Sequence, residues 1–523
     1  MLRGTSLRNT WREATTAEGF LVTTDGGQLN RKSLRTPIQS SMDVFHLKIV
    51  ITGILFSIVI YAIPWSDFLL STVPRDDYVD LTSNETLKQD VHFVILGATG
   101  DLALRYLFPA LFSIRTNSTP TEIRVTIYAT SRQAPDVIRN SVELSIDAAI
   151  GCTEVVQRDF LSFIKYRQLR ASEDFERLCT SIPSTDKLVF YLSIPPSAYA
   201  NTVKNFGLFC KNGRREADIR LVLEKPFGAD YSSARALFEK LKQWFPFERY
   251  YLVDHYKAKE ATIAIPEFFA KNSDVAADFI SSNSSTIELV LNETLGVTDR
   301  ISFYDETGVV RDVVQNHLME ILIDIVSAIT KKVNSDLERS SLITNVSIDT
   351  VNFGQYESYN QELAKSAVRE GPSNTPTFVR AEASLKSTLL KDVKVSFTAG
   401  KKLSRKVSQA RLTFGDGEVD KEVVFHIGGQ GLNYPAVLFR GFTRNSVICP
   451  SGRPLSERVP YKALLSESKA LFQVCPLGTT FRNAYEAVIE DILRWQSQYS
   501  TDVGFILSSW ALWDPWIKKL GTG

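Results

Sequence analysis

Short apolar runs alternate with amphipathic stretches between about residue 90 and residue 253. Each run has the length of a buried strand, and several end in glycine, proline or charge. The runs are His92–Leu96, Ile123–Ala129, Lys187–Ile194, Arg220–Leu223 and Tyr250–Val253. Strands that alternate with helical stretches predict a parallel sheet, with ligands at the carboxyl ends of the strands. Further along, Thr286–Leu291 and Val393–Phe397 are typical of strands, and Val313–Thr330 predicts a long buried helix.

One apolar run without charge, from Ile49 to Ser66, is just long enough to span a bilayer. Residues 1–44, rich in Arg, Thr, Ser and Gly, predict a disordered tail, and residues 67–88 predict a short stalk. Basic residues precede the run and mostly acids follow it, so the positive-inside rule leaves the tail in the cytosol and the body in a lumen. We therefore expect a transmembrane signal anchor at residues 45–66. A cleaved signal peptide and a buried core helix remain alternatives.

The composition is that of an ordinary globular protein of 523 residues, with 44% hydrophobic residues and a net charge of +1. That balance gives no support to nucleic-acid binding. The five cysteines show no metal-ligand spacing, so no metal is expected, and they neither require nor exclude a disulfide. Glycosylation triplets, compatible with a lumenal body, occur at Asn84, Asn117, Asn283, Asn292 and Asn345.

A glycine-rich turn follows the first strand-like run and precedes a helical stretch. Its residues are Gly97, Ala98, Thr99, Gly100, Asp101 and Leu102. A strand, such a turn and a helix direct backbone N–H groups toward a phosphate, although the spacing is not the full dinucleotide fingerprint and tight turns need glycine anyway. The next strand ends without the acid expected of an NAD site, whereas Ser131 and Arg132 there suit a 2′-phosphate. NADP is therefore the expected cofactor.

Two stretches gather side chains suited to acid–base chemistry and anion binding. Asp254, His255, Tyr256 and Lys259 follow a strand-like run, and His317 ends the stretch that begins at Gly308. The chain has five histidines, and two of them fall in these stretches. Polar groups at the end of a buried strand are typical of an anion site. The plainer alternatives are a solvated loop and, for His317, a core histidine with a satisfied hydrogen bond.

Five blocks, in this order, resemble the glucose-6-phosphate dehydrogenase family. The blocks are Gly97–Ala103, Tyr191–Pro196, Glu224–Gly228, Asp254–Glu260 and Arg311–His317. The resemblance starts near residue 90 and weakens after about residue 420. It implies a Rossmann-like α/β domain over residues 89–252, then an α+β substrate and oligomerisation domain with a large, mainly antiparallel sheet over residues 253–523. By the same analogy we expect a homodimer or homotetramer.

The resemblance also implies a reaction and a set of site residues. The family oxidises glucose 6-phosphate at C1 to the lactone and passes hydride to NADP⁺, the first step of the oxidative pentose phosphate pathway. By position, His317 matches the family's base and Asp254 matches the carboxylate that orients it. The substrate contacts that match are Lys225, which also meets the cofactor, the phosphate-pocket residues His255, Tyr256 and Lys259, and the sugar contacts Glu293, Asp312 and Lys401.

The chain departs from the family's pattern mainly around the cofactor. Tyr106 stands where a phosphate-side lysine is expected, and Thr130 stands where an arginine is expected, which leaves Arg132 to meet the 2′-phosphate. The lysine usual before Glu293 is Asn292, within a glycosylation triplet whose glycan would obstruct the site. These departures concern cofactor preference and affinity more than reaction type, because the base and its carboxylate are retained.

Two other functions stay open. A non-catalytic, membrane-anchored paralogue that binds sugar phosphate would fit the changes at Tyr106 and Thr130, but the retained His317 and Asp254 argue against it. A dehydrogenase of a non-phosphorylated sugar would leave the phosphate-pocket residues without a role. The sequence therefore predicts a membrane-anchored, lumen-facing NADP-dependent dehydrogenase, with the endoplasmic reticulum as the expected compartment.

Overall fold

The computed structural model describes most of the chain after residue 88. The described residues are 89–117, 123–149, 154–331, 336–366, 371–387, 389–390, 393–415, 420–443, 446–450, 459–460 and 471–520. They belong to one compact unit, Leu81–Gly523. The predicted tail (1–44), membrane span (45–66) and stalk (67–88) lie outside the described residues.

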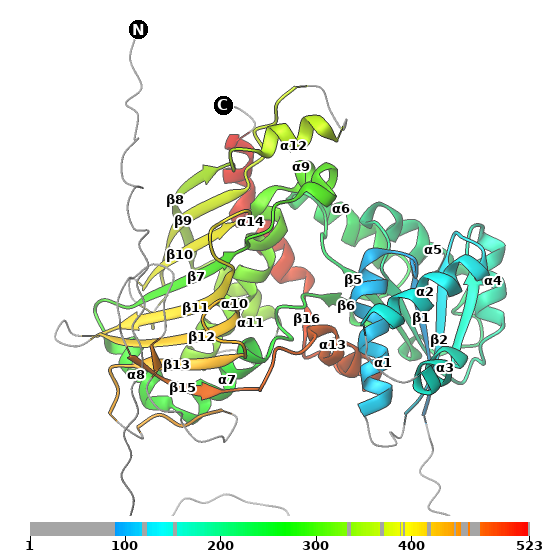
Figure 1. Ribbon diagram of the computed structural model, residues 1–523, viewed down its shortest axis with the longest axis horizontal. Coiled ribbons are helices and arrows are strands. Elements are labelled where there is room, and N and C mark those ends of the chain that lie inside the picture. Colours follow the sequence, from blue (N-terminus) through cyan, green and yellow to red (C-terminus); the bar gives the residue numbers. More distant parts are fainter. Residues whose placement is uncertain are drawn as a thin grey trace, which may run out of the picture. The chain divides into compact units, whose positions relative to one another are not determined.

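The first sheet has seven strands in the order β16-β6-β5-β4-β1-β2-β3 (Figure 1). The strands are β1 (Gln89–Leu96), β2 (Ile123–Ser131), β3 (Ile164–Gln168), β4 (Lys187–Leu192), β5 (Ile219–Glu224), β6 (Tyr250–Val253) and β16 (Ser500–Thr501). Neighbouring strands are parallel except for β16 with β6. The order from β3 to β6 is that of a dinucleotide-binding Rossmann fold, so the predicted parallel sheet is confirmed.

Helices cover both faces of this sheet and form two separate cores. Phe93 and Ile127 pack with α1 and α2, whereas Phe190 packs on the other side against Phe206 of α5. Strands buried on both faces need continuous apolar sequence, which explains the runs seen along the chain. The helical segments of this part are η1 (Ala103–Leu107), α1 (Phe108–Asn117), α2 (Pro135–Ala149), α3 (Glu154–Ser162), α4 (Ser172–Thr180), η2 (Pro196–Ala198), α5 (Tyr199–Phe209), η3 (Glu216–Asp218), α6 (Tyr231–Lys242) and η4 (Phe247–Arg249).

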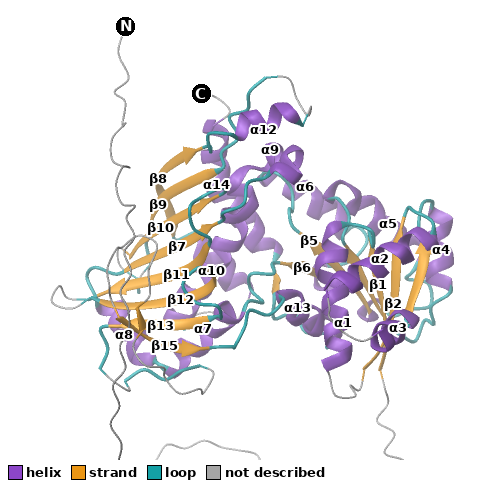
Figure 2. Ribbon diagram, in the orientation of Figure 1, coloured by secondary structure: helices purple, strands orange, loops and turns teal. Residues whose placement is uncertain are grey.

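The second sheet has nine strands in the order β14-β15-β13-β12-β11-β7-β10-β9-β8 (Figure 2). Its strands are β7 (Thr286–Asn292), β8 (Val346–Gly354), β9 (Phe378–Leu385), β10 (Val393–Gly400), β11 (Val407–Phe414), β12 (Lys421–Gly429), β13 (Ala436–Arg440), β14 (Val459–Pro460) and β15 (Leu471–Pro476). Only β7 and β10 are parallel among these described pairs. The expected large, mainly antiparallel sheet is confirmed.

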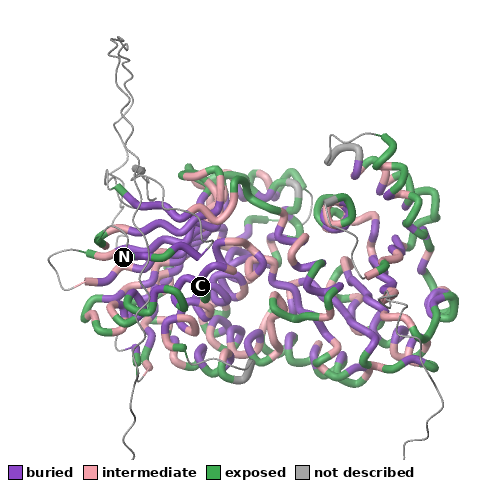
Figure 3. The backbone as a smooth tube through the Cα atoms, turned by 90° about the horizontal axis from the view of Figure 1, so that it is seen from below, coloured by how far each residue is buried: buried purple, intermediate pink, exposed green. Residues whose placement is uncertain are grey.

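Helices pack against one face of the second sheet, and buried residues follow both sheets closely (Figure 3). The helical segments of this part are α7 (Glu260–Lys271), α8 (Ser273–Ser281), η5 (Thr298–Arg300), α9 (Ile301–Val309), η6 (Val310–Leu318), α10 (Met319–Thr330), α11 (Asp336–Ile343), α12 (Tyr359–Lys365) and α14 (Val503–Leu520), and α13 (Ala484–Leu493) belongs to the core of the first sheet. Among the described residues one helical run, Ile301–Thr330, is long and apolar enough to cross a membrane. Because 72% of its most apolar window is buried, it has the character of a core helix, as the sequence predicts.

The end of the chain returns to the first sheet. Strand β16 pairs with β6, and α13 packs against α1. Tyr251 donates a hydrogen bond to Asp491 of α13 at 2.7 Å, and Arg220 donates to the carbonyl of Gln496 at 2.5 Å. The predicted split at residues 252 and 253 therefore omits a C-terminal contribution to the dinucleotide-binding domain.

Candidate active site

The Asp254–Lys259 stretch forms a tight turn between β6 and α7. The N–H of Tyr256 donates to Asp254 Oδ1 at 2.9 Å, and the N–H groups of Lys257 and Lys259 donate to the carbonyls of Asp254 and Tyr256. β6 is buried along its whole length, so the turn begins inside the protein and Asp254 is only 3% exposed. A carboxylate buried this deeply needs a partner.

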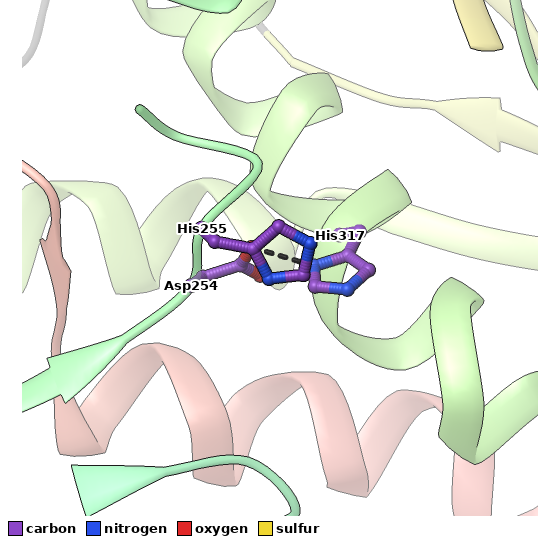
Figure 4. A group of neighbouring side chains, drawn as sticks. All are labelled: Asp254, His255 and His317. Carbon is purple, nitrogen blue, oxygen red and sulfur yellow. Dashed lines mark hydrogen bonds and ion pairs between the residues drawn. The ribbon is translucent and has the colours of Figure 1, made fainter. Parts of the chain in front are cut away.

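That partner is His317, on η6 (Figure 4). His317 Nδ1 lies 2.5 Å from Asp254 Oδ1, and the imidazole is 2% exposed. Burial, together with Lys225, Lys259 and Lys401, holds the pKa of His317 well below its ordinary value of 6.5, while burial raises the pKa of Asp254. The imidazole is therefore neutral, and the Asp254 bond leaves its Nε2 as the nitrogen that can accept a proton.

Two further rings from the turn surround His317. The His255 ring lies edge-on at 4.7 Å, and the Tyr256 ring stacks at 4.2 Å. Burial, His317 and Lys259 hold the pKa of His255 well below its usual range, so His255 is a neutral hydrogen-bonding group and not a second cation. Lys259 Nζ lies 4.8 Å from the centre of the Tyr256 ring. These three residues, matched by resemblance to a phosphate pocket, do lie together.

A second cluster joins the ends of β5, β7 and β10 to η6. Lys225, which follows β5, donates to the carbonyl of Asp312, and its Nζ lies 3.8 Å from Asp312 Oδ1. Lys401, which follows β10, pairs with Glu293 and lies 2.8 Å from Asp312 Oδ2. Burial favours the neutral form of Asp312, but Lys225, Lys401 and Arg300 together hold its pKa well below the usual range. Asp312 is thus ionised and can accept hydrogen bonds from hydroxyl groups.

The glycine-rich turn lies at the carboxyl end of β1, as predicted. Gly97 has φ +80°, and a Cβ there would lie 2.3 Å from the carbonyl oxygen of Ser193, so the turn requires glycine. The following helix begins at Asp101, and the first N–H groups of a helix have no intrahelical acceptor. This arrangement fits a dinucleotide phosphate. Leu102 is half-buried, whereas Asp101 is exposed and pairs with Arg105 at 2.7 Å.

At the end of β2, Thr130 faces the protein interior, whereas the predicted cofactor contacts Ser131 and Arg132 are more exposed. The Thr130 side chain is fully buried and donates to the carbonyl of Ile95 at 2.9 Å, while its own carbonyl accepts from Gly97 and Ala98. Thr130 therefore supports the turn from inside. Ser131 is half-buried and Arg132 is exposed, on the side where an adenosine ribose would lie.

Sequence reasoning missed three residues of the site. Tyr485 of α13 stacks on His255 at 5.6 Å, and its ring lies tilted against that of Tyr106 at 5.5 Å. Glu224 accepts hydrogen bonds from Tyr191 and Tyr485, and burial raises its pKa to about 7. Arg300 lies 3.7 Å from Asp312. Tyr485 and Arg300 lie outside the recognised blocks, and Glu224 lies inside one but carried no assigned role.

The side chains of Asp254, His255 and His317 also resemble a metal-binding group, since one ligand atom from each lies within 4.8 Å of the others. The hydrogen bond between Asp254 and His317 gives the carboxylate a role without a cation. A buried imidazole hydrogen-bonded to a carboxylate is an arrangement suited to general-base chemistry.

A doubly wound dinucleotide-binding sheet, a second sheet domain and a buried His–Asp pair between them define a two-domain protein of the dinucleotide-binding class. Two family models match the chain: "Glucose-6-phosphate dehydrogenase, NAD binding domain" over residues 94–263 and "Glucose-6-phosphate dehydrogenase, C-terminal domain" over residues 272–522. The chain belongs to the glucose-6-phosphate dehydrogenase family. The match continues well past residue 420, where the motif resemblance weakens.

Two curated relatives and one solved structure illustrate the similarity. The GDH/6PGL endoplasmic bifunctional protein of Oryctolagus cuniculus is 27% identical over 479 residues, which cover 83% of this chain and 60% of that protein. This chain thus spans about 60% of the length of that relative. Glucose-6-phosphate 1-dehydrogenase 5, cytoplasmic, of Arabidopsis thaliana is 26% identical over 483 residues, covering 87% of this chain and 90% of that protein. A solved glucose-6-phosphate dehydrogenase in complex with its substrate glucose-6-phosphate has a TM-score of 0.65 at 22% identity, with 83% and 92% of the two chains covered, and supports the fold.

Proposed function

We propose that this protein oxidises glucose 6-phosphate at C1 to 6-phosphogluconolactone with hydride transfer to NADP, the first step of the oxidative pentose phosphate pathway. The observation that carries the proposal is the buried pair of His317 and Asp254, next to Lys225 and Asp312 and between the two domains. His317 Nε2 takes the proton of the C1 hydroxyl, and Asp254 stabilises the imidazolium that forms. NADP⁺, when bound, supplies the acceptor for the hydride that leaves C1.

The other site residues orient the sugar phosphate. Lys259 supplies positive charge to the phosphate, and His255 and Tyr256 supply hydrogen-bond donors. Glu293 and Asp312, both paired with Lys401, accept hydrogen bonds from sugar hydroxyls. Lys225 lies at the end of β5, where cofactor and substrate would meet. The same set supports a phosphorylated substrate over a free sugar.

The first test is NADP⁺ reduction by the purified protein with glucose 6-phosphate, beside His317→Asn. We expect turnover from the unmodified protein and a loss of kcat of about 10²–10⁴-fold in the variant, the range for removal of a general base. A protein that binds glucose 6-phosphate but reduces neither NADP⁺ nor NAD⁺ would instead be a non-catalytic paralogue. Equal kcat/KM for glucose and glucose 6-phosphate would contradict the phosphate-pocket assignment.

We further propose a single-pass signal anchor at residues 45–66 with the body in the lumen of the endoplasmic reticulum. Two disulfides, Cys179–Cys210 and Cys449–Cys475, support an oxidising compartment for the body. The endoplasmic name of the rabbit relative points the same way. In microsomes, the body should resist protease until detergent is added, and it should stay in the membrane after carbonate extraction. Digestion without detergent, or release by carbonate, would overturn the topology.

The oligomeric state proposed by analogy is a homodimer or homotetramer. Light scattering of the purified protein in detergent, corrected for bound detergent, gives the number of chains. A monomer at micromolar concentration would contradict this proposal and leave the chemistry of the site untouched.

A further inference from the structure

The site expected for the 2′-phosphate has Thr130 at the position where an arginine is expected. Thr130 is buried and bonded to Ile95, so its hydroxyl supports the glycine-rich turn and does not face a ligand. Arg132 then remains as one exposed cation at the end of β2. If the proposed function is right, discrimination between NADP and NAD needs a second charged donor near Arg132, because one exposed guanidinium gives modest selectivity.

The structure provides a neighbour from the next strand. β2 and β3 run parallel with Ser131 beside Gln168, so both strands end at the same edge of the sheet. Beyond that point the two chain segments are joined. The N–H of Leu169 donates to the carbonyl of Ser131 at 2.8 Å, and Gln168 Nε2 donates to the carbonyl of Arg132 at 3.0 Å. Arg170 Nε donates to the same carbonyl at 2.6 Å. The Arg170 guanidinium is thereby held against the backbone of Arg132.

The positive charges of Arg132 and Arg170 have no carboxylate partner among the described residues. Within the described part of the chain, neither Arg132 nor Arg170 forms an ion pair. The nearest carboxylate in sequence, Asp174, accepts the backbone N–H groups of Arg170 and Ala171 at 2.7 and 2.9 Å and pairs with Arg177. The Asp174 carboxylate is therefore engaged by backbone N–H groups at the start of α4 and by Arg177, and it does not pair with the Arg170 guanidinium. The four N–H groups on the two terminal nitrogens of Arg170 remain for a ligand.

We propose that Arg170 is a specificity-determining residue, which with Arg132 binds the 2′-phosphate of NADP and so replaces the anchor that Thr130 does not provide. The position is suitable, because the turn that would hold the pyrophosphate bonds directly to Thr130, one residue before Ser131. From there the adenosine ribose of a dinucleotide extends toward the end of β2. The tether to the Arg132 carbonyl fixes the guanidinium in advance, so little side-chain entropy is lost on binding.

The test measures binding of adenosine 2′,5′-bisphosphate and of 5′-AMP to the full chain by isothermal titration calorimetry. The two probes differ only in the 2′-phosphate. We expect the unmodified protein to prefer the bisphosphate. Arg170→Gln should weaken bisphosphate binding by about tenfold, as for loss of a charge-assisted hydrogen bond, and leave 5′-AMP binding unchanged. The control is Arg177→Gln, which also removes one positive charge but affects only the ion pair with Asp174. It should leave both affinities within about twofold of those of the unmodified protein.

Each result has a definite consequence. If the ratio of the two affinities is the same in Arg170→Gln as in the unmodified protein, Arg170 does not determine specificity. This holds whether both affinities stay constant or both fall equally, and an equal fall would indicate a structural effect. In either case a preference of the unmodified protein for the bisphosphate would leave NADP use intact. If the unmodified protein shows no preference for the bisphosphate, NADP selectivity itself fails, and this inference fails with it.

Discussion

His317, the proposed base, is a residue whose charge state is set by its burial. His317 and Asp254 are 2% and 3% exposed, so a charge at either position loses most of its hydration and needs an opposite charge nearby. For a charged His317 that group is Asp254, because the neighbouring lysines disfavour the imidazolium. The neutral imidazole is held in one orientation by the bond from Nδ1 to Asp254. Once a proton arrives on Nε2, the carboxylate becomes the counter-ion of an imidazolium. Asp254 thus stabilises the protonated His317 more strongly than the neutral one.

Replacing Asp254 by Asn tests this role. The amide keeps the size of the side chain but removes the counter-ion and favours the wrong tautomer of His317, so kcat should fall by about 10²–10⁴-fold while KM for glucose 6-phosphate changes little. Initial rates over a range of glucose 6-phosphate concentrations separate the two parameters. Asp274→Asn, on the exposed side of α8, is the matched control. A kcat within a few-fold of the unmodified enzyme would rule out the orienting role.

The acidic limb of the pH profile should lie below the ordinary histidine value. The base acts in its deprotonated form, and burial and neighbouring lysines lower its pKa from 6.5. Activity is therefore lost only when the pH falls through that lowered value. The measurement is kcat/KM for glucose 6-phosphate, which reports the free enzyme, between about pH 5 and pH 8, the interval in which an unperturbed histidine would titrate. A half-maximal rate at or above pH 6.5 would contradict the environment assigned to His317.

Glu224 predicts a pH dependence of stability. Its pKa rises from 4.5 to about 7 on burial, so the folded state holds this proton more firmly than the unfolded state, and stability falls as the pH rises from 4.5 to 7. Glu224→Gln removes this titration, so the difference in unfolding free energy between the variant and the unmodified protein should shift by up to roughly 3 kcal/mol in the variant's favour between acid and neutral pH. Urea unfolding of both proteins at each pH measures it. A constant difference would show that folding does not shift the pKa of Glu224.

At the scale of elements, the ends of strands decide which side chains reach the site. β7 ends at Asn292, and β10 ends at Gly400, its parallel neighbour in the same register. The N–H of Glu293 donates to the carbonyl of Gly400 at 2.9 Å, so Glu293 and Lys401 leave the sheet side by side. Asn292 Oδ1 is buried and lacks a hydrogen-bond partner among the described residues. A glycan on Asn292 would have to pass through this packing.

Glycan occupancy should therefore differ between two triplets only nine positions apart in the printed sequence. Asn283 lies in an exposed turn between α8 and β7, whereas Asn292 is half-buried at the end of β7, beside the site. In the active protein purified from a secretory pathway, Asn283 should carry a glycan and Asn292 should not. Glycosidase treatment in heavy-oxygen water, followed by peptide mass spectrometry, marks the occupied sites. Occupied Asn292 in active enzyme would contradict the packing of Glu293 and Lys401.

Sequence alone could predict the elements that carry local signals. The blocks from Gly97 to Ala103 and from Asp254 to Glu260 combine turn chemistry with adjacent strands, and the structure has turns and strands there. Thr130 could not be assigned a direction, because the sequence does not tell which face of β2 each side chain occupies when both faces are buried. The two disulfides could not be predicted from the sequence either. Their pairing depends on how α4 meets α5 and how the 446–450 loop meets β15, and spacing does not encode these contacts.

For the whole molecule, the main surprise is how the chain's end serves both domains. Tyr485 of α13 reaches His255 and Tyr106, and β16 completes the first sheet beside β6. Helix α14 then returns to the second domain, where Ser509 donates to the carbonyl of Gln315 on η6 at 2.5 Å. Such long-range contacts leave no periodicity or motif in the local sequence. The predicted division into residues 89–252 and 253–523 rests on contiguous segments and does not include such contacts.

The last element provides a test of whether the two domains fold as one cooperative unit. Trp510 of α14 is 1% exposed, and its indole N–H donates to the carbonyl of Phe227 at 3.0 Å, in the loop that follows β5 and Lys225. Trp510→Ala removes packing and a hydrogen bond between α14 and that loop, so it should cost about 3–5 kcal/mol. Because α14 also holds η6, the loss should lower one shared unfolding transition, followed together by circular dichroism and by activity. Trp516→Ala, at a half-buried position of the same helix, should cost less. Two separate transitions, of which only one moves in Trp510→Ala, would show that the domains unfold independently and that the return of the chain's end does not couple them.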